Sequence, residues 1–158
     1  FDIDAIRNKI IDFKPDMVFI TCSYIIPKEL LKVNENISWF NKHASLLPHG
    51  KGVFPYIYNK INGFEQGISF HYVLESIDTG DIVYFERINL KRTMVDFYKE
   101  IFDNFDKYFM EFYKNLKRNV RQKQYEPGSY YSYPDKNILK KFYKAGGKII
   151  TMKDIFSE

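Results

Sequence analysis

The residues with the clearest capacity for chemistry in this chain are an asparagine, a histidine and an aspartate in two separate segments. Asn41 and His43 belong to the run Asn-Lys-His-Ala-Ser-Leu-Leu-Pro, and Asp78 belongs to Ile-Asp-Thr-Gly-Asp-Ile. An amide can donate to a developing oxyanion, an imidazole can move protons, and a carboxylate can orient and charge-stabilise that imidazole. The set therefore suits acyl transfer to an amine.

Strand-like segments are expected to position these three side chains. A short apolar stretch before Asn41 predicts a buried strand, with Asn41 and His43 on the same face at its carboxyl end. Asp78 lies on the loop between two further strand-like runs, residues 68–74 and 82–89. We expect the three side chains to converge at one end of a sheet, where open α/β folds bind their ligands.

Hydrophobic periodicity and capping residues predict the remaining elements. About eight residues separate the two strands that flank Asp78, too few for a parallel crossover, which predicts an antiparallel pair. The other expected elements are helices over 3–13, from Pro27 to about Val33 and from Pro55 to Asn62, strands at 17–22 and 37–41, one long amphipathic helix from Thr93 to about Asn119, an extended segment at 130–134, a short helix at 138–143 and a short strand at 149–150.

The segments 15–28, 41–48 and 78–82, with Gly52 and Gly67, occur in one order and resemble the 10-formyltetrahydrofolate-dependent formyltransferases. That family includes methionyl-tRNA formyltransferase, glycinamide ribonucleotide transformylase and the sugar N-formyltransferases. The resemblance implies an α/β, Rossmann-like formyltransferase fold with a mixed, mostly parallel sheet and flanking helices. It also implies that the family's first βα units are missing from this chain, which begins without Met.

Without those units, the apolar strand at 17–22 is expected to be an exposed edge, which invites pairing with another chain and hence a homodimer. We divide the chain into a partial catalytic core, residues 1–120, and a C-terminal extension, residues 121–158.

The resemblance also implies which residues bind and react. Asn41, His43 and Asp78 would be catalytic, and the co-substrate would be 10-formyltetrahydrofolate. The residues expected to bind this folate are Ser23, Tyr24, Ile25, Ile26, Ile77, Asp78 and Asp81. No metal is expected, because the spacings of the histidines and Asp78 fit no recognised zinc motif.

The acceptor is expected to be a small-molecule amine. Residues 114–158 hold 11 basic and 4 acidic residues, together with tyrosines at 125, 130, 131 and 133. Such a segment can attract phosphates and stack on a base, which favours a nucleotide-linked amino sugar. Glycinamide ribonucleotide and methionyl-tRNA remain alternatives, the second disfavoured because the chain has no room for a substantial RNA-binding domain. A non-catalytic folate-binding fragment is a further alternative.

Composition places the chain among globular proteins, with 158 residues, 45% of them hydrophobic, and a net charge of +4. No apolar run approaches the ~20 residues of a membrane span, and no signal peptide is visible. We therefore expect a cytoplasmic protein with neither a membrane nor a nucleic acid as partner. The single cysteine, Cys22, excludes an internal disulfide and is expected to be a small buried residue.

The two remaining histidines are assigned no chemical role. His71 alternates with Ile68, Phe70 and Tyr72 in its predicted strand, which places it on the wetter face. His49 lies in a glycine-rich loop and is expected to be exposed.

Overall fold

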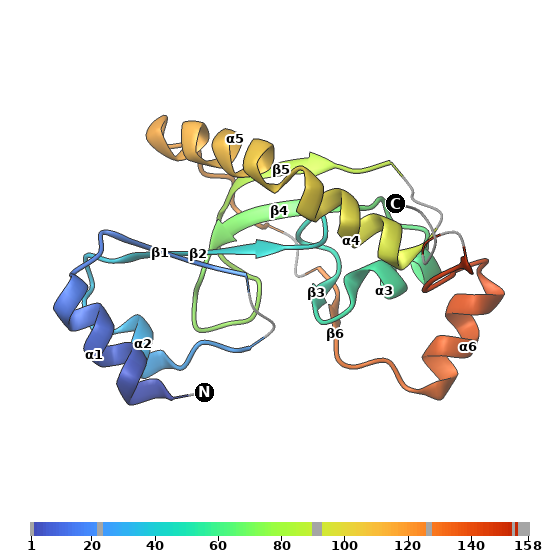
Figure 1. Cartoon of the computed structure of the whole chain (residues 1–158), viewed down its shortest axis with the longest axis horizontal. Coiled ribbons are helices and arrows are strands. Elements are labelled where there is room, and N and C mark those ends of the chain that lie inside the picture. Colours follow the sequence, from blue (N-terminus) through green and yellow to red (C-terminus); the bar gives the residue numbers. More distant parts are fainter. Residues whose placement is uncertain (1, 22–23, 90–92, 126–127, 153, 155–158) are drawn as a thin grey trace.

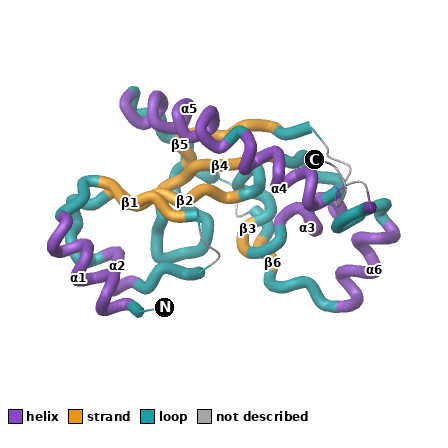
Figure 2. The backbone as a smooth tube through the Cα atoms, in the orientation of Figure 1, coloured by secondary structure: helices purple, strands orange, loops and turns teal. Residues whose placement is uncertain are grey.

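A computed structural model gives the fold and describes residues 2–21, 24–89, 93–125, 128–152 and 154. Figures 1 and 2 show helices packed around a central sheet. The elements in chain order are α1 (Ile3–Phe13), β1 (Met17–Ile20), α2 (Lys28–Leu31), β2 (Ser38–His43), β3 (Lys51–Gly52), α3 (Pro55–Asn62), β4 (Gly67–Tyr72), β5 (Ile82–Arg87), α4 (Met94–Asp103), α5 (Phe105–Lys117), β6 (Tyr130–Tyr131) and α6 (Lys136–Lys144).

The central sheet has the strand order β1-β2-β4-β5. β1 and β2 are parallel, and β4 is antiparallel to both of its neighbours. The antiparallel pair β4 and β5 confirms the prediction from their short connection. A mostly parallel sheet is wrong for the described strands, because only one of the three pairings in this sheet is parallel. His43 pairs with Ser69, so the chain re-enters the sheet at the end where it left, and β4 must therefore reverse direction.

Neighbouring residues of β2 point into two different hydrophobic cores. Phe40 is fully buried with Phe70 and with Phe112 of α5, whereas Trp39 is buried with Leu30 of α2. Figure 1 shows α4 and α5 on one side of the sheet and α1 and α2 on the other, beside β1. Burial on both faces explains why β1 appears in the sequence as an apolar run and why two large apolar residues, Trp39 and Phe40, are adjacent in β2.

β1 lies at one edge of the described sheet, in agreement with the expected exposed edge. It ends at Ile20, two residues earlier than predicted. Cys22, expected to be a small buried residue, lies outside the described residues.

The predicted long helix is wrong, because two helices, α4 and α5, take its place. Asn104 separates them with a non-helical backbone (φ −112°, ψ 17°), and its side-chain amide donates to the carbonyl oxygen of Glu100 at 3.0 Å. An asparagine side chain competes with the backbone for hydrogen bonds and so favours a helix end. The apolar spacing continues through the break, with Ile101 and Phe105 in one core, so periodicity could not reveal it.

The C-terminal region packs against the rest of the chain. β6 pairs in parallel with β3, and Phe142 of α6 is fully buried in the same core as Phe40. The boundary at residue 120 stays a prediction. The short strand expected at 149–150 is absent from the described backbone, because the carbonyl of Ile149 instead accepts from Val95 N at the start of α4, at 3.1 Å.

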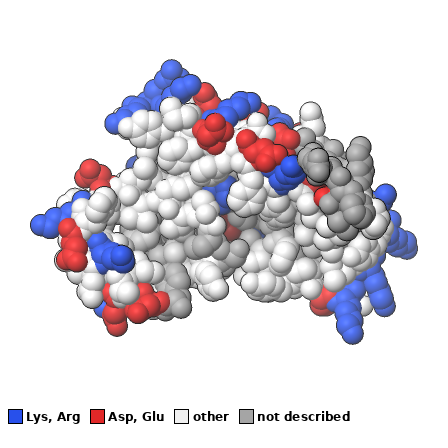
Figure 3. All heavy atoms as spheres, viewed as in Figure 1, with Lys and Arg blue, Asp and Glu red and all other residues white. Residues whose placement is uncertain are grey.

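Basic side chains gather over the C-terminal half of α5 and around α6 (Figure 3). The lysines and arginine of these two surfaces include Lys114, Lys117, Arg118, Lys136, Lys140, Lys141 and Lys144. The basic excess in the sequence is therefore divided between two surfaces. None of the described helices combines the length and the apolar content that crossing a membrane would require.

Candidate active site

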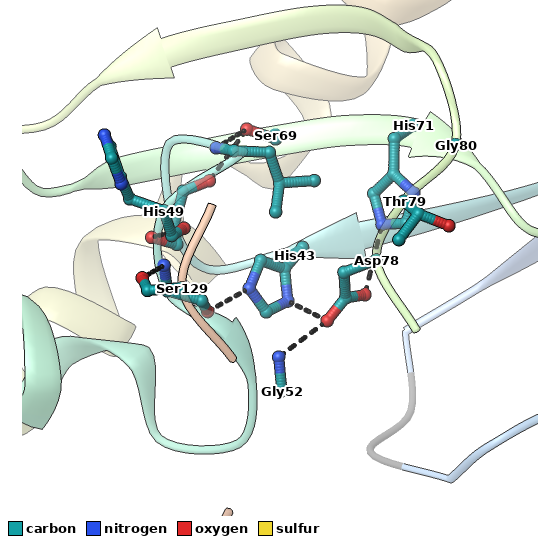
Figure 4. Close-up of polar contacts among 12 residues, drawn as sticks. His43, His49, Gly52, Ser69, His71, Asp78, Thr79, Gly80 and Ser129 are labelled. Atoms are coloured by element: carbon teal, nitrogen blue, oxygen red, sulfur yellow. Dashed lines mark hydrogen bonds and ion pairs between the residues drawn. The ribbon is translucent and has the colours of Figure 1, made fainter. Parts of the chain in front are cut away.

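The carboxyl ends of β1 and β2 border a cavity of about 300 Å³. Asn41 and His43 line it from β2, and Asp78 lines it from the loop between β4 and β5. In Figure 4 the side chains of His43, His71 and Asp78 point toward one another. The structure thus brings the three sequence-predicted residues together at the expected end of the sheet, and their catalytic role stays a prediction.

His43 is held on both sides of its ring. Its Nε2 donates to the carbonyl oxygen of Gly50 at 2.7 Å, and its Nδ1 lies 3.5 Å from Oδ2 of Asp78 (Figure 4). The side chain is only 7% exposed. Burial lowers the pKa of the His43 imidazole, whereas the charge of Asp78 and the Gly50 hydrogen bond act to raise it.

Asp78 adopts a left-handed backbone (φ 51°), which aspartate tolerates better than most residues. Its Oδ2 accepts a hydrogen bond from Gly52 N at 2.9 Å. Burial alone would raise the pKa of the Asp78 carboxyl, but His71, His43 and the Gly52 amide together lower it to about 2. The carboxyl is therefore ionised at neutral pH.

His71 is the residue that sequence reasoning placed wrongly. It is buried, not on a wet face, and its Nε2 lies 3.4 Å from Oδ1 of Asp78. The alternation argument failed because both faces of β4 are covered, so the strand has no wet face before Tyr72. His71 is the direct partner of Asn41 where β4 pairs with β2. A histidine on the strand next to Asn41 was therefore the signal that could have revealed its place in the site.

The acceptors around the two rings fix the hydrogen positions. Nδ1 of His71 faces the carbonyl oxygen of Tyr72 at 2.8 Å, and a carbonyl only accepts, so this nitrogen and Nε2 of His43 each carry a hydrogen. The charge of Asp78 favours a second proton on the His43 ring, but burial outweighs it and lowers the pKa of that ring. The charge of His71 acts to lower the pKa of His43. The cluster therefore holds one carboxylate beside a His43 imidazole whose pKa lies below its ordinary value, so His43 is neutral at neutral pH before a substrate binds.

The Asn41 side chain contains a polar atom to which no described residue hydrogen-bonds. Its buried Oδ1 has no hydrogen-bond partner among the described residues, although the side chain lines the cavity. Buried polar groups are usually paired, so an amide left in this state next to a cavity is suited to a ligand. Rotation of the amide would present either its oxygen or its NH₂ group.

The predicted folate-site residues divide into three groups. Five of them line the cavity: Tyr24, Ile25, Ile26, Ile77 and Asp78. The side chains of Tyr24 and Ile25 are 71% and 66% exposed, which leaves apolar surface open to a flat ring. Asp81 is not among the lining residues, and its carbonyl accepts from Tyr72 N at 3.0 Å. Ser23 lies outside the described residues.

A serine near the other end of the chain fixes the loop beside His43. Ser129 Oγ accepts a hydrogen bond from Gly50 N at 3.0 Å, and the Ser129 carbonyl accepts from Lys51 N at 2.8 Å (Figure 4). Gly50 is the residue whose carbonyl holds His43. Sequence reasoning missed Ser129, because no local pattern links residues that are 79 positions apart.

Comparison with models of protein families shows to which family the chain belongs. The family model described as formyl transferase matches residues 3–109, a stretch that contains Asn41, His43, His71 and Asp78. The chain belongs to the formyl transferase family.

Curated relatives in the formyl transferase family include methionyl-tRNA formyltransferases. That of Clostridioides difficile (strain 630) is 35% identical over 85 residues, which are 52% of this chain and 27% of that protein. That of Bacillus cytotoxicus is 38% identical over 79 residues, which are 48% of this chain and 24% of that protein. The matched part of the chain thus spans about a quarter of the length of these relatives.

Solved structures of formyltransferases share the fold. A 4-N formyltransferase from Francisella tularensis has a TM-score of 0.69 at 24% identity, over 98% of this chain and 64% of that one. The formyltransferase PseJ from Anoxybacillus kamchatkensis, in complex with UDP-4,6-dideoxy-4-formamido-L-AltNAc and tetrahydrofolate, has a TM-score of 0.62 at 23% identity, over 80% of this chain and 67% of that one. These likenesses support a formyltransferase-like α/β fold with a mixed sheet and flanking helices.

Proposed function

We propose that the protein transfers a formyl group from 10-formyltetrahydrofolate to a primary amine. The observation that carries this proposal is the His43–Asp78–His71 cluster beside the unsatisfied amide of Asn41, all lining one cavity. Membership of the formyl transferase family supports the reaction class.

The proposed chemistry follows from the groups in the cavity. The acceptor nitrogen bonds to the formyl carbon, and the formyl oxygen takes up negative charge that the Asn41 amide stabilises by donating N–H. The bond from the formyl carbon to the folate nitrogen then breaks. The amine loses a proton and the folate nitrogen gains one, and ionised Asp78 with the neighbouring His43 imidazole moves these protons directly or through one water.

His43 needs a small movement to contact the reacting atoms. Both of its ring nitrogens face protein groups, Gly50 and Asp78. A rotation that takes Nε2 away from the Gly50 carbonyl would turn this donor toward the formyl oxygen, and Asp78 would stabilise the charge that the ring gains when it accepts a proton.

The folate would bind through the segment that contains Tyr24 and Ile25 and through the loop that contains Ile77 and Asp78. Exposed apolar side chains line this part of the cavity together with an Asn41 oxygen that has no partner among the described residues, and a pterin offers both a flat face and polar edges. The residues present therefore fit the co-substrate.

A nucleotide-linked amino sugar is the acceptor that we favour. One solved structure of this fold is named a 4-N formyltransferase, and another formyltransferase is in complex with a UDP-linked formamido sugar. In this chain, Tyr130 and Tyr133 line the cavity with side chains that are 58% and 70% exposed, which suits stacking on a base. Methionyl-tRNA is the second candidate acceptor, because the curated relatives with similar sequences are named methionyl-tRNA formyltransferases.

A panel of acceptors decides between these substrates. Nucleotide-linked 3- and 4-amino sugars, glycinamide ribonucleotide and charged initiator tRNA are each supplied with 10-formyltetrahydrofolate, and formylated product is quantified. We expect turnover with an amino sugar. Turnover confined to glycinamide ribonucleotide or tRNA would exclude the amino-sugar assignment and leave the formyl transfer standing.

A further inference from the structure

Lys42 stands between Asn41 and His43 in β2 and lines the same cavity. Side chains alternate along a strand, so Lys42 points toward the opposite face from its two neighbours. Its ammonium lies 5.5 Å from the centre of the Phe102 ring of α4. The cavity therefore extends past the end of β2 to the side covered by α4.

Lys42 has no acidic partner in the part of the chain that the structure describes. Burial lowers the pKa of its amine, and no described carboxylate acts to raise it. A cation withdrawn from water costs free energy unless it is paired. The Phe102 ring gives only a cation–π contact, which does not replace a counter-charge. An anionic ligand in the cavity would complete the pairing.

Tyr98 adds a second donor on the same side of the cavity. It precedes Phe102 by one helical turn on α4, so the two side chains share a face. Tyr98 lines the cavity, and its hydroxyl makes no hydrogen bond to another described residue. Burial raises the pKa of Tyr98 to about 12, so the hydroxyl stays protonated and can donate at neutral pH.

We propose that Lys42 and Tyr98 bind an oxyanion of a substrate, either a phosphate of the acceptor or a carboxylate of the folate. A lysine ammonium binds phosphate or carboxylate as a point charge, and a phenol donates a further hydrogen bond. This inference rests on the proposed function, because it assigns one more ligand group to the same cavity.

Calorimetric affinities for four probes test the site and identify the source of the anion. UDP and 5-formyltetrahydrofolate carry the two anions, and uridine and 6-hydroxymethylpterin are their counterparts without the phosphates or the glutamate. We expect Lys42→Met to weaken one of the two anionic probes by about tenfold or more, the loss of one charge-assisted hydrogen bond. Loss for UDP assigns a phosphate site, and loss for the folate assigns a carboxylate site. Both counterparts should bind unchanged.

Two further variants keep the test sharp. Lys42→Arg retains the charge and should retain most of the affinity. Lys117→Met is the matched control, because Lys117 also lies over an aromatic ring, 5.3 Å from the centre of Tyr113, but outside the lining of the cavity. An equal loss in Lys117→Met would overturn the inference by showing a general charge effect.

The remaining outcomes separate this inference from the function. If the wild type binds 5-formyltetrahydrofolate and Lys42→Met binds both anions equally well, the oxyanion site is wrong and the proposed function stands. If the wild type binds neither anionic probe, both proposals fail. Removing a desolvated cation should not destabilise the fold. A melting temperature of Lys42→Met equal to or above that of the wild type would therefore show that the variant is folded.

Discussion

At the scale of single residues, the proposed chemistry depends on how firmly His43 is held. Gly50 and Asp78 contact opposite edges of its ring, and His71 supports Asp78 from the other side. The imidazole is thus held beside the cavity before any substrate binds, and one rotation away from Gly50 brings it to the reacting atoms.

Replacing His43 by alanine should reduce formyl transfer by about 10²-fold or more, the usual contribution of a positioned proton-transfer group. The variant should stay folded but melt at a lower temperature, because the Gly50 carbonyl and Asp78 each lose a buried partner. Initial rates and thermal unfolding measure the two effects. His49→Ala is the control, because His49 stacks on Phe64 at 4.4 Å and should keep its rate. A His43 variant that keeps most of its rate, or that unfolds, would mark this histidine as structural.

Asp78 predicts a pH-dependent stability. Its pKa lies at about 2 in the folded chain against an ordinary 3.8, so its ionised form stabilises the fold above pH ~4, and this is lost as the pH falls toward 2. The stability advantage of the wild type over Asp78→Asn should therefore shrink by roughly 1.5 kcal/mol between pH 4.5 and 2.5. Urea unfolding of both proteins measures it. A constant difference across this window would contradict the assigned pKa.

The sequence allowed Asn41, His43 and Asp78 to be predicted as neighbours, because strand ends and a short loop fix where such residues lie. It could not reveal His71, because a period-two pattern predicts a wet face only when one face of the strand is free, and β4 is covered on both. Asp81 was expected at the folate site from the family resemblance, but in the structure its carbonyl accepts from Tyr72 N and its side chain does not line the cavity.

At the scale of elements, β3 and β6 link the C-terminal region to the active-site loop. Lys51 and Gly52 pair with Tyr130 and Tyr131. Gly52 also donates to Asp78, so this short pair holds a partner of the carboxylate in place. Ser129, next to β6, holds Gly50 in turn.

Ser129→Ala should lower kcat by several-fold and stability by about 1 kcal/mol, the typical net value of one hydrogen bond. The Gly50 amide would lose its acceptor, which loosens the carbonyl that orients His43. Ser38→Ala is the control, because Ser38 lies outside the cavity lining and bonds to Asp16 through its backbone N–H and not its side chain. Steady-state kinetics and urea unfolding compare the two, and equal effects would remove the positioning role of Ser129.

Element boundaries were predictable where a capping residue ends a pattern. The helix α3 begins at Pro55 and ends before Gly63, as the sequence indicated. The break at Asn104 was not predictable, because the apolar spacing of α4 continues into α5 and one asparagine among many gives no clear signal. Pairing of β3 with β6 joins distant two-residue segments, which no local pattern marks.

At the scale of the whole molecule, β1 is an edge strand whose two faces are already covered. Met17 and Phe19 pack against one core, and Val18 and Ile20 pack against the other. The edge of β1 away from β2 pairs with no other described strand, so it could pair with a strand of a second copy. A homodimer through this edge stays a prediction. In sedimentation velocity, the sedimentation coefficient should rise with protein concentration. A protein that stays monomeric at every concentration would contradict the homodimer.

The most direct test of formyl transfer at this site compares the wild type with Asn41→Leu, which keeps the side-chain size but removes the amide. Single-turnover rates are measured with 10-formyltetrahydrofolate and a nucleotide-linked 4-amino sugar, and folate affinity is measured separately by calorimetry. We predict transfer by the wild type and a rate about 10²–10³-fold lower in the variant, as for loss of one oxyanion donor. Transfer to no primary amine by the wild type, or an undiminished rate in the variant, would contradict the account.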